Sequence, residues 1–88
     1  MKYKRKFMRR ITRIIDGDTA EMNKPVYGSC YVRLSNTNAP EYGEVGYYSA
    51  KRNFSRRFRN RRVWIRSVGR SYGRIVAKVR RVRSDRRW

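Results

Sequence analysis

The sequence predicts one small domain of the α+β class, mainly β with a single helix, in the order β-β-β-α-β-β. Its 88 residues suffice for one domain, which buries only about two thirds of the unfolded surface at this size. Short runs of alternating apolar and polar residues, bounded by turn residues, predict strands, and one stretch with apolar residues three and four positions apart predicts a helix.

The N-terminal part of the chain predicts two strands joined by a tight turn. Basic and apolar side chains alternate, with interruptions, from Arg5 to Ile15, as in a strand with one buried face. The Asp-Gly pair of "IIDGDT" is typical of a hairpin turn, so a short second strand follows from Thr19 to Met22. The tripeptide "NKP" then predicts a second turn.

The segment "VYGSCYVRL" predicts a third strand with one face in the core. Its period of two places Cys30, Val32 and Leu34 on the inner face and Arg33 on the solvent face. Cys30 is the chain's single cysteine, and we interpret it as a small buried apolar side chain rather than as part of a disulfide or a zinc cluster.

The second half of the chain predicts a loop, a helix and two more strands. The loop is "SNTNAPEYGEVG", and a helix from about Tyr47 to Asn60 follows, since its apolar residues recur at helical spacing. These residues are Tyr47, Ala50, Phe54 and Phe58. A strand "RVWIRSV" with Val63 and Ile65 on one side, a turn "GRSYG" and a last strand "RIVAKVRRV" complete the order.

Five short antiparallel strands with one helix predict the partly open barrel of the OB fold, a common scaffold for nucleic-acid binding. We assign residues 1–83 to this single domain with a basic N-terminal start, and residues 84–88 to a basic tail with too little apolar content to fold alone.

The charge predicts a polyanion as the partner. The formal net charge is +19, and 19 of the 25 basic residues are arginine, whose planar guanidinium matches phosphate. Seven Tyr, three Phe and two Trp are interspersed among them, which suits contact with both phosphates and bases of DNA or RNA. Without any histidine, catalysis by a His base or a Ser-His-Asp triad is excluded.

We expect no membrane association and no secretion. No apolar run approaches the roughly 18 residues of a membrane span, and the basic start is not followed by the apolar segment of a signal peptide. The expected location is the cytoplasm or the interior of a virion.

The few carboxylates are concentrated in two predicted loops, and five of the six acidic residues lie there. They are Asp16, Asp18, Glu21, Glu41 and Glu44. If the first turn of the barrel lies near the loop after the third strand, these oxygens can converge on a hard divalent cation. The alternative is that they only end strands and offset local positive charge.

Three motifs in order resemble the staphylococcal nuclease (thermonuclease) family over most of the chain. They are "IDGDT" (Ile15 to Thr19), "RL...NAPE" (Arg33 to Glu41) and "YGR" (Tyr72 to Arg74). The resemblance implies an OB barrel and a Ca²⁺-dependent phosphodiesterase that acts on DNA and RNA, with Mg²⁺ as the other candidate ion.

The resemblance also implies a role for seven residues. Asp18 and position 38 correspond to metal-ligating aspartates, Ala39 to a backbone carbonyl ligand, and Asp16 to a supporting carboxylate. Glu41 corresponds to the general base, and Arg33 and Arg74 to the arginines that grip the scissile phosphate. Arginine suits that task because it stays protonated and donates two parallel bonds.

The chain departs from the family pattern at two points. Asn38 replaces an aspartate, so the metal site loses a negative charge and metal affinity should fall. The family's C-terminal helices have no counterpart after Val82, so we expect part of the barrel to be open, where a protein partner could cover it. Two functions remain: a metal-dependent endonuclease, or a catalytically impaired nucleic-acid-binding or packaging protein on the same fold.

Overall fold

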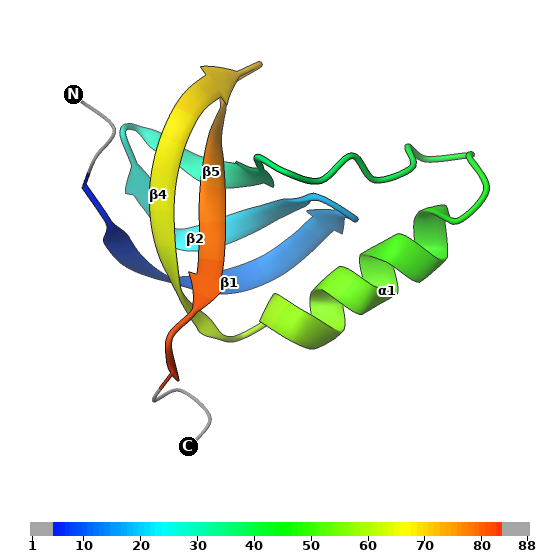
Figure 1. Cartoon of the computed structure of the whole chain (residues 1–88), viewed down its shortest axis with the longest axis horizontal. Helices are drawn as coiled ribbons and strands as arrows, with labels where there is room; N and C mark the ends of the chain where they lie inside the picture. The colour runs from blue at the N-terminus through cyan, green and yellow to red at the C-terminus, as the bar shows by residue number, and fades with distance from the viewer. Residues whose placement is uncertain (1–4, 84–88) are drawn as a thin grey trace.

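The computed structural model describes residues 5–83, which form a five-stranded barrel with one helix beside it (Figure 1). The elements are β1 (Phe7–Asp16), β2 (Thr19–Val26), β3 (Ser29–Leu34), α1 (Tyr47–Phe58), β4 (Arg62–Ser71) and β5 (Arg74–Arg81). This order confirms the predicted α+β class, mainly β, and the five-stranded OB-like barrel.

The barrel is closed by the strand order β1-β2-β3-β5-β4, with β4 pairing back onto β1. Only β3 and β5 run parallel, and every other pair is antiparallel. The expectation of a partly open barrel is therefore wrong for the described residues. The reason is the length of β1: Phe7 to Arg10 pair with β4, whereas Ile11 to Asp16 pair with β2, with irregularities in the register after Ile11 and after Ile14.

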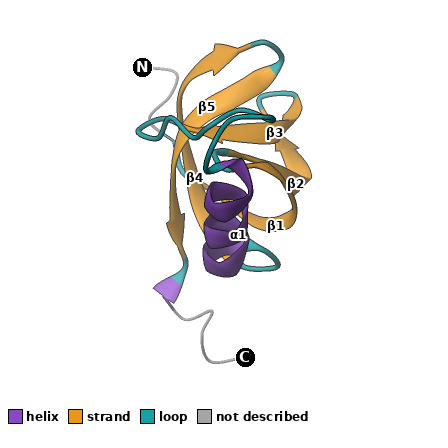
Figure 2. Cartoon of the chain, turned by 90° about the vertical axis from the view of Figure 1, so that its right-hand side faces the viewer, coloured by secondary structure: helices purple, strands orange, loops and turns teal. Residues whose placement is uncertain are grey.

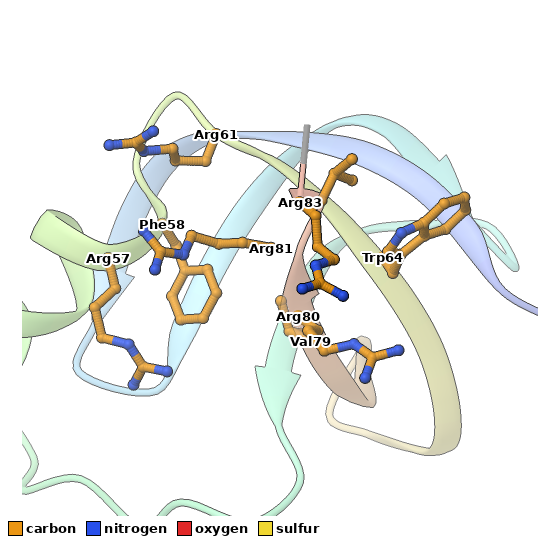
Figure 3. A pocket seen from close by; sticks show the side chains of 9 residues that line it. Arg57, Phe58, Arg61, Trp64, Val79, Arg80, Arg81 and Arg83 are labelled. Carbon is orange, nitrogen blue, oxygen red and sulfur yellow. The ribbon is translucent and has the colours of Figure 1, made fainter. Parts of the chain in front are cut away.

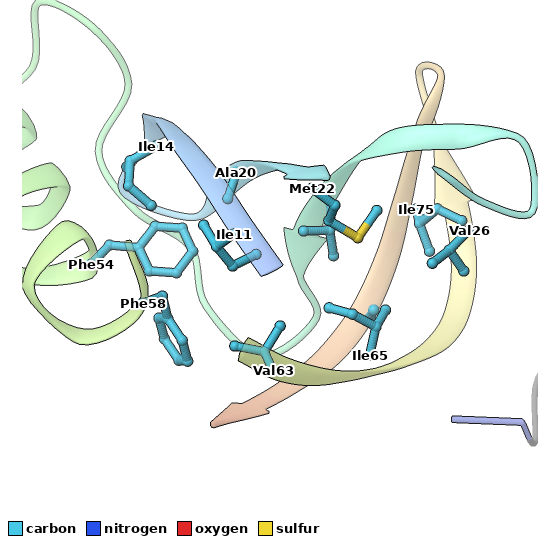
Figure 4. Close-up of a cluster of buried hydrophobic side chains, with 12 residues drawn as sticks. Ile11, Ile14, Ala20, Met22, Val26, Phe54, Phe58, Val63, Ile65 and Ile75 are labelled. Atoms are coloured by element: carbon cyan, nitrogen blue, oxygen red, sulfur yellow. The ribbon is translucent and has the colours of Figure 1, made fainter. Parts of the chain in front are cut away.

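The core fills the barrel with alternate residues of the strands, as the period of two predicts. Ile11, Val63 and Ile65 are fully buried at its centre, and Ile75 and Val26 lie toward the end away from the helix (Figure 4). Cys30, expected to be buried, is only half-buried, although it lies on the same face of β3 as the buried Val32.

The helix α1 closes one side of the core, and its aromatic residues are the contact. Phe54 and Phe58 are buried and point from the helix toward Ile11 and Ile14 of β1 (Figure 4), and Figure 2 shows α1 lying against the barrel. The helix ends at Phe58, slightly before the predicted Asn60. Asn60 adopts a positive φ of 61° and its N–H donates to the Ile11 carbonyl, so the chain leaves the helix to pair with β1.

One predicted turn is misplaced and another is shorter than predicted, and backbone conformation shows where each turn lies. The residues of "NKP" belong to β2, and the turn follows at Tyr27 and Gly28, with φ of 48° and 84°. The second turn is likewise confined to Tyr72 and Gly73, with φ of 53° and 77°, and the preceding residues of "GRSYG" extend β4. Positive φ at both central positions fits the right-handed twist of the flanking strands.

Two further sequence predictions concern the ends and the membrane. The basic tail of residues 84–88 lies outside the described residues. Within residues 5–83 the one helix is neither long nor apolar enough to cross a membrane.

Candidate active site

The first hairpin turn and the loop after β3 meet, as the sequence predicts. The N–H of Leu34 donates to the Asp18 carbonyl at 2.9 Å, and the N–H of Ala39 donates to Asp18 Oδ2 at 3.3 Å. Gly17 makes this approach possible, since a Cβ at that position would lie 2.8 Å from the Cβ atoms of both Ala39 and Ala50. The turn is thereby held between the loop and α1.

Asp18 is the buried carboxylate at the centre of this junction. The residue is 8% exposed, and its Oδ1 accepts a hydrogen bond from the Thr19 hydroxyl at 3.0 Å. Its Oδ2 lies 3.4 Å from a terminal nitrogen of the Arg33 guanidinium, in addition to the bond from Ala39. Both carboxylate oxygens of Asp18 therefore have partners, Thr19 at Oδ1 and Ala39 and Arg33 at Oδ2.

Arg33 bridges two of the expected metal ligands. The same terminal nitrogen that faces Asp18 donates to Asn38 Oδ1 at 2.8 Å. Arg33 is aligned with Thr19 across the β2–β3 ladder, which brings its side chain to the level of the first turn. Its side chain remains about a quarter exposed, at 26%, so it is accessible to a ligand.

Arg74 reaches the corner formed by Asp18 and Thr19 from another strand. It is the first residue of β5, and its terminal nitrogen donates to the Thr19 hydroxyl at 3.4 Å. Thr19 thus links Asp18 to Arg74, while Arg33 contacts Asp18 directly. The structure therefore brings Arg33 to the Asp18 carboxylate and Arg74 to the Thr19 hydroxyl beside it.

Asp16 has a different environment from the expected one. Its Oδ1 accepts a hydrogen bond from the Tyr47 hydroxyl at 2.8 Å, which raises the pKa of that hydroxyl above its ordinary value of 10.0. The tyrosine hydroxyl also lies 3.4 Å from the Ile15 carbonyl oxygen. Asp16 therefore connects the end of β1, next to the β1–β2 turn, to the start of α1.

Glu41 is exposed and its carboxylate has no hydrogen bond or ion pair within residues 5–83. Only its backbone is held: its N–H donates to Glu44 Oε1 at 2.6 Å, and its carbonyl accepts from the Glu44 N–H at 2.9 Å. Glu21 pairs with Arg13 at 2.9 Å. Of the five acidic residues predicted to lie in the two loops, Asp18 is the one that contacts Arg33 within the described residues, and Thr19 links it to Arg74.

The oxygen atoms around Asp18 and Asn38 are of the kind that bind a hard divalent cation, but they carry little negative charge. The part of the chain that the structure describes has no group of three His, Cys, Asp or Glu side chains suited to a metal. The Asp18 carboxylate and the Asn38 amide oxygen are nevertheless both within reach of one positive group, the Arg33 guanidinium. Oxygen donors of this kind match Ca²⁺ or Mg²⁺, and a single carboxylate implies weak affinity.

Sequence reasoning missed three contributors to the site. Thr19 appears only as the last letter of "IDGDT", yet its hydroxyl joins Asp18 to Arg74. Tyr47 was assigned to the apolar stripe of the helix, although its hydroxyl holds Asp16. Gly17 lies in the predicted turn, but its φ is not positive, and its missing side chain is what allows the close approach of Ala39.

Exposed aromatic rings lie along the loop that carries Glu41. Tyr42 makes edge-to-face contacts with Tyr47 and Tyr48, at centroid distances of 5.5 Å and 6.4 Å. Tyr42 and Tyr48 are exposed, as is Tyr72 in the turn before Arg74. Each offers a face on which a base could stack.

The chain matches no protein-family model, and a search of curated proteins finds no significant match.

Proposed function

We propose that this chain is a metal-dependent endonuclease that hydrolyses phosphodiester bonds of DNA, RNA or both, as the staphylococcal nuclease motifs imply. The observation that carries the proposal is the meeting of Arg33 and Arg74 at the Asp18–Thr19 corner. These residues come from three separate motifs, and the barrel gathers them at one accessible place.

The arginines would bind and orient the scissile phosphate. Each guanidinium donates to a phosphoryl oxygen, and both stay protonated while negative charge grows on those oxygens in the transition state. Arg33 would leave its contacts with Asp18 and Asn38 for the phosphate. Those two side chains, with the Ala39 carbonyl, would then hold the divalent cation, which neutralises phosphate charge and lowers the pKa of a bound water.

Glu41 would act as the general base. Its carboxylate has no partner within the described residues, so it is free to accept a proton from water beside the phosphate. The water oxygen forms a bond to phosphorus, its proton passes to Glu41, and the ester P–O bond opposite breaks. The leaving oxygen takes its proton from solvent.

The rest of the surface supports a nucleic acid as the substrate. A formal charge of +19 on 88 residues attracts phosphates along the whole strand, and Tyr42, Tyr48 and Tyr72 offer exposed rings near the site. If the protein neutralises about six to ten phosphates, raising the salt concentration from 50 to 200 mM should lower its affinity for the nucleic acid by roughly 10³ to 10⁵.

The second candidate is a nucleic-acid-binding protein without catalysis. It is favoured by Arg33, whose guanidinium contacts both Asp18 and Asn38 and so competes with a metal for them. Because Asn38 has no charge, Asp18 is the one carboxylate at this junction that attracts a divalent cation. The cation therefore competes poorly with the Arg33 guanidinium for these oxygens. In such a protein the same arginines would hold phosphate without cleaving it.

Cleavage assays separate the two candidates. Plasmid DNA and single-stranded RNA are incubated with Ca²⁺, with Mg²⁺ and with chelator, and cleavage should require one of the ions. Glu41→Gln should lower the cleavage rate by about 10² to 10⁴ with little loss of binding. Glu44→Gln, a change of the same kind in the same loop, is the matched control and should keep the rate.

The arginines are tested in the same assay against an arginine outside the site. Arg33→Ala and Arg74→Ala should each lower the rate by about 10² to 10³, whereas Arg52→Ala on the exposed face of α1 should not. Equal losses at all three positions would contradict the site. No cleavage by the wild type at any metal concentration would leave the binding protein as the function.

A further inference from the structure

A groove of about 840 Å³ lies between the C-terminal end of α1, the start of β4 and the end of β5 (Figure 3). It is remote from the candidate active site, because β5 begins with Arg74 at that site and ends with Arg81 at the groove. Seven residues of strand at about 3.3 Å each separate the two by roughly 23 Å. A single phosphate cannot reach both.

The side chains that line the groove are mostly arginines, with apolar side chains between them. Five arginines line it, with Trp64 at one side (Figure 3). They are Arg57, Arg61, Arg80, Arg81 and Arg83. Phe58, Val79 and Val82 supply the apolar surface between them, and the Arg57 guanidinium lies 4.8 Å from the Phe58 ring centroid.

No carboxylate among residues 5–83 offsets this charge. All the acidic residues in that range lie either in the first hairpin or in the loop between β3 and α1, and none lines the groove. The two ion pairs observed in the described chain also lie elsewhere, at Arg13 and at Arg33. Five like charges at one groove repel one another, so a bound anion would lower the electrostatic energy there.

Trp64 places an aromatic face beside the arginines. It is paired with Arg80 across the β4–β5 ladder, so both side chains project from the outer face of the barrel. The Lys6 ammonium group lies 5.2 Å from the centroid of the Trp64 ring. A half-buried indole among guanidinium groups provides one ring for stacking and several donors for phosphate.

A basic strip continues from the groove toward the candidate active site. The next outward pair of β4 and β5 is Arg66 with Lys78, both exposed. The uncharged pair Gly69 with Val76 follows, and the last pair of the ladder is Ser71 with Arg74. At the axial rise of about 3.4 Å per nucleotide that a base-stacked strand has, roughly seven nucleotides cover the 23 Å from the groove to Arg74. A short oligonucleotide can occupy only one of the two places.

We propose that the arginine groove is a second nucleic-acid-binding site, which holds a single-stranded segment with phosphates on the arginines and one base stacked on Trp64. A single strand is the favoured ligand because a duplex keeps its base faces stacked inside and cannot offer one to the indole. The groove does not depend on the proposed cleavage, because its residues take no part in that chemistry.

The test measures the fluorescence of Trp64 itself. The buffer contains chelator, so that no metal-dependent cleavage occurs. Trp88→Phe removes the other tryptophan, and the protein is titrated with thymidylate oligomers of four and sixteen nucleotides. Both should quench the Trp64 fluorescence, and the longer one should bind more tightly because it reaches both sites. Trp64→Ala, followed by anisotropy of a labelled oligomer, should weaken binding by about 5- to 150-fold, and Trp64→Phe should weaken it less.

The arginines are tested by the salt dependence of binding to the longer oligomer. Arg80→Ala/Arg81→Ala should reduce the slope of log K against log salt by about 1.4, since each lost phosphate contact on a single strand contributes roughly 0.7. Arg52→Ala/Arg56→Ala removes the same charge from α1 and should leave the slope unchanged. Arg80→Lys/Arg81→Lys keeps the charge and should keep the slope. If the alanine variant does not fold, Arg80→Gln/Arg81→Gln removes the same charge with less loss of side-chain volume and should reduce the slope by the same amount.

Several results would overturn the proposal. Absence of quenching by either oligomer would do so, and so would equal loss of slope in the two double-alanine variants. Tighter binding of an acidic peptide, or of phosphatidylserine vesicles, than of the oligomer at the same salt would assign the groove to that partner instead. Because these readouts are made in chelator, a failure here leaves the proposed nuclease activity untouched, and the absence of cleavage leaves the groove untouched.

Discussion

Gly17→Ala should destabilise the fold and disturb the candidate site together, because Gly17 lies where three segments meet. Its added Cβ would lie 2.8 Å from the Cβ atoms of Ala39 and Ala50, and 3.3 Å from the Ala50 carbonyl carbon. Carbon atoms in favourable contact are about 3.5–4.0 Å apart, so each neighbour would have to retreat by roughly 0.7 Å or more. Both are restrained, since Ala39 is bonded to Asp18 and Ala50 belongs to α1. Overpacking of this kind costs about 1–3 kcal/mol in the free energy of unfolding.

Urea unfolding measures this cost. With a slope of about 1 kcal/mol per molar urea for a domain of this size, the midpoint should fall by roughly 1–3 M. Gly69→Ala is the matched control, because its Cβ would meet nothing within 4 Å and its φ is not positive. That variant should be as stable as the wild type, or more stable by up to about 1 kcal/mol.

Equal midpoints for Gly17→Ala and Gly69→Ala would refute the reasoning, since of these two glycines only Gly17 has no space for a Cβ. A second readout follows from the contact between Ala39 and Asp18. If Ala39 is pushed away, the metal concentration for half-maximal cleavage should rise in Gly17→Ala and stay constant in Gly69→Ala.

Three further substitutions test the core, the support of the turn and the expected metal ligands. Phe54→Ala should lower the free energy of unfolding by about 3–5 kcal/mol, measured by urea, because Phe54 is buried between α1 and β1; a loss under 1 kcal/mol would contradict this packing. Tyr47→Phe should lower the melting temperature at pH 7, because it removes the hydrogen bond to Asp16. That bond raises the pKa of the Tyr47 hydroxyl, so the stabilisation that the hydroxyl provides is complete below pH 10 and is lost as pH rises through the raised pKa. The difference from wild type should therefore shrink above pH 10, and a constant difference would show that titration of this hydroxyl is not linked to folding. Asn38→Asp places carboxylates on both sides of the Arg33 guanidinium and should stabilise the metal-free protein by up to about 1 kcal/mol while lowering the metal concentration for half-maximal cleavage; cleavage absent at every concentration would favour the binding protein.

The order and type of the elements could be predicted from the sequence because they depend on local patterns. The period of two in "CYVRL" and the spacing of Tyr47, Phe54 and Phe58 are set by the geometry of a strand and a helix. The convergence of the first turn with the loop at Ala39 could also be predicted, because barrel topology brings these segments together. The motif residues Asp18, Arg33 and Arg74 do lie at one corner.

Only the tertiary structure decided which groups those residues contact. Asp16 contacts Tyr47 rather than a site beside Asp18, because α1 packs where its carboxylate emerges. Likewise, Arg33 reaches both Asp18 and Asn38 because the β2–β3 register aligns it with Thr19.

The positions of the turns, the closure of the barrel and the arginine groove also depend on contacts between distant segments. Tyr27 and Tyr72 enter positive φ where the paired strands reverse, which no dipeptide preference shows, and β1 closes the barrel by pairing with both β2 and β4. Arg61 and Arg80 are far apart in the chain and share a groove only after β4 and β5 pair. The physical reason is common to all: periodicity and turn chemistry act over a few residues, whereas register and packing are set by the free energy of the whole barrel.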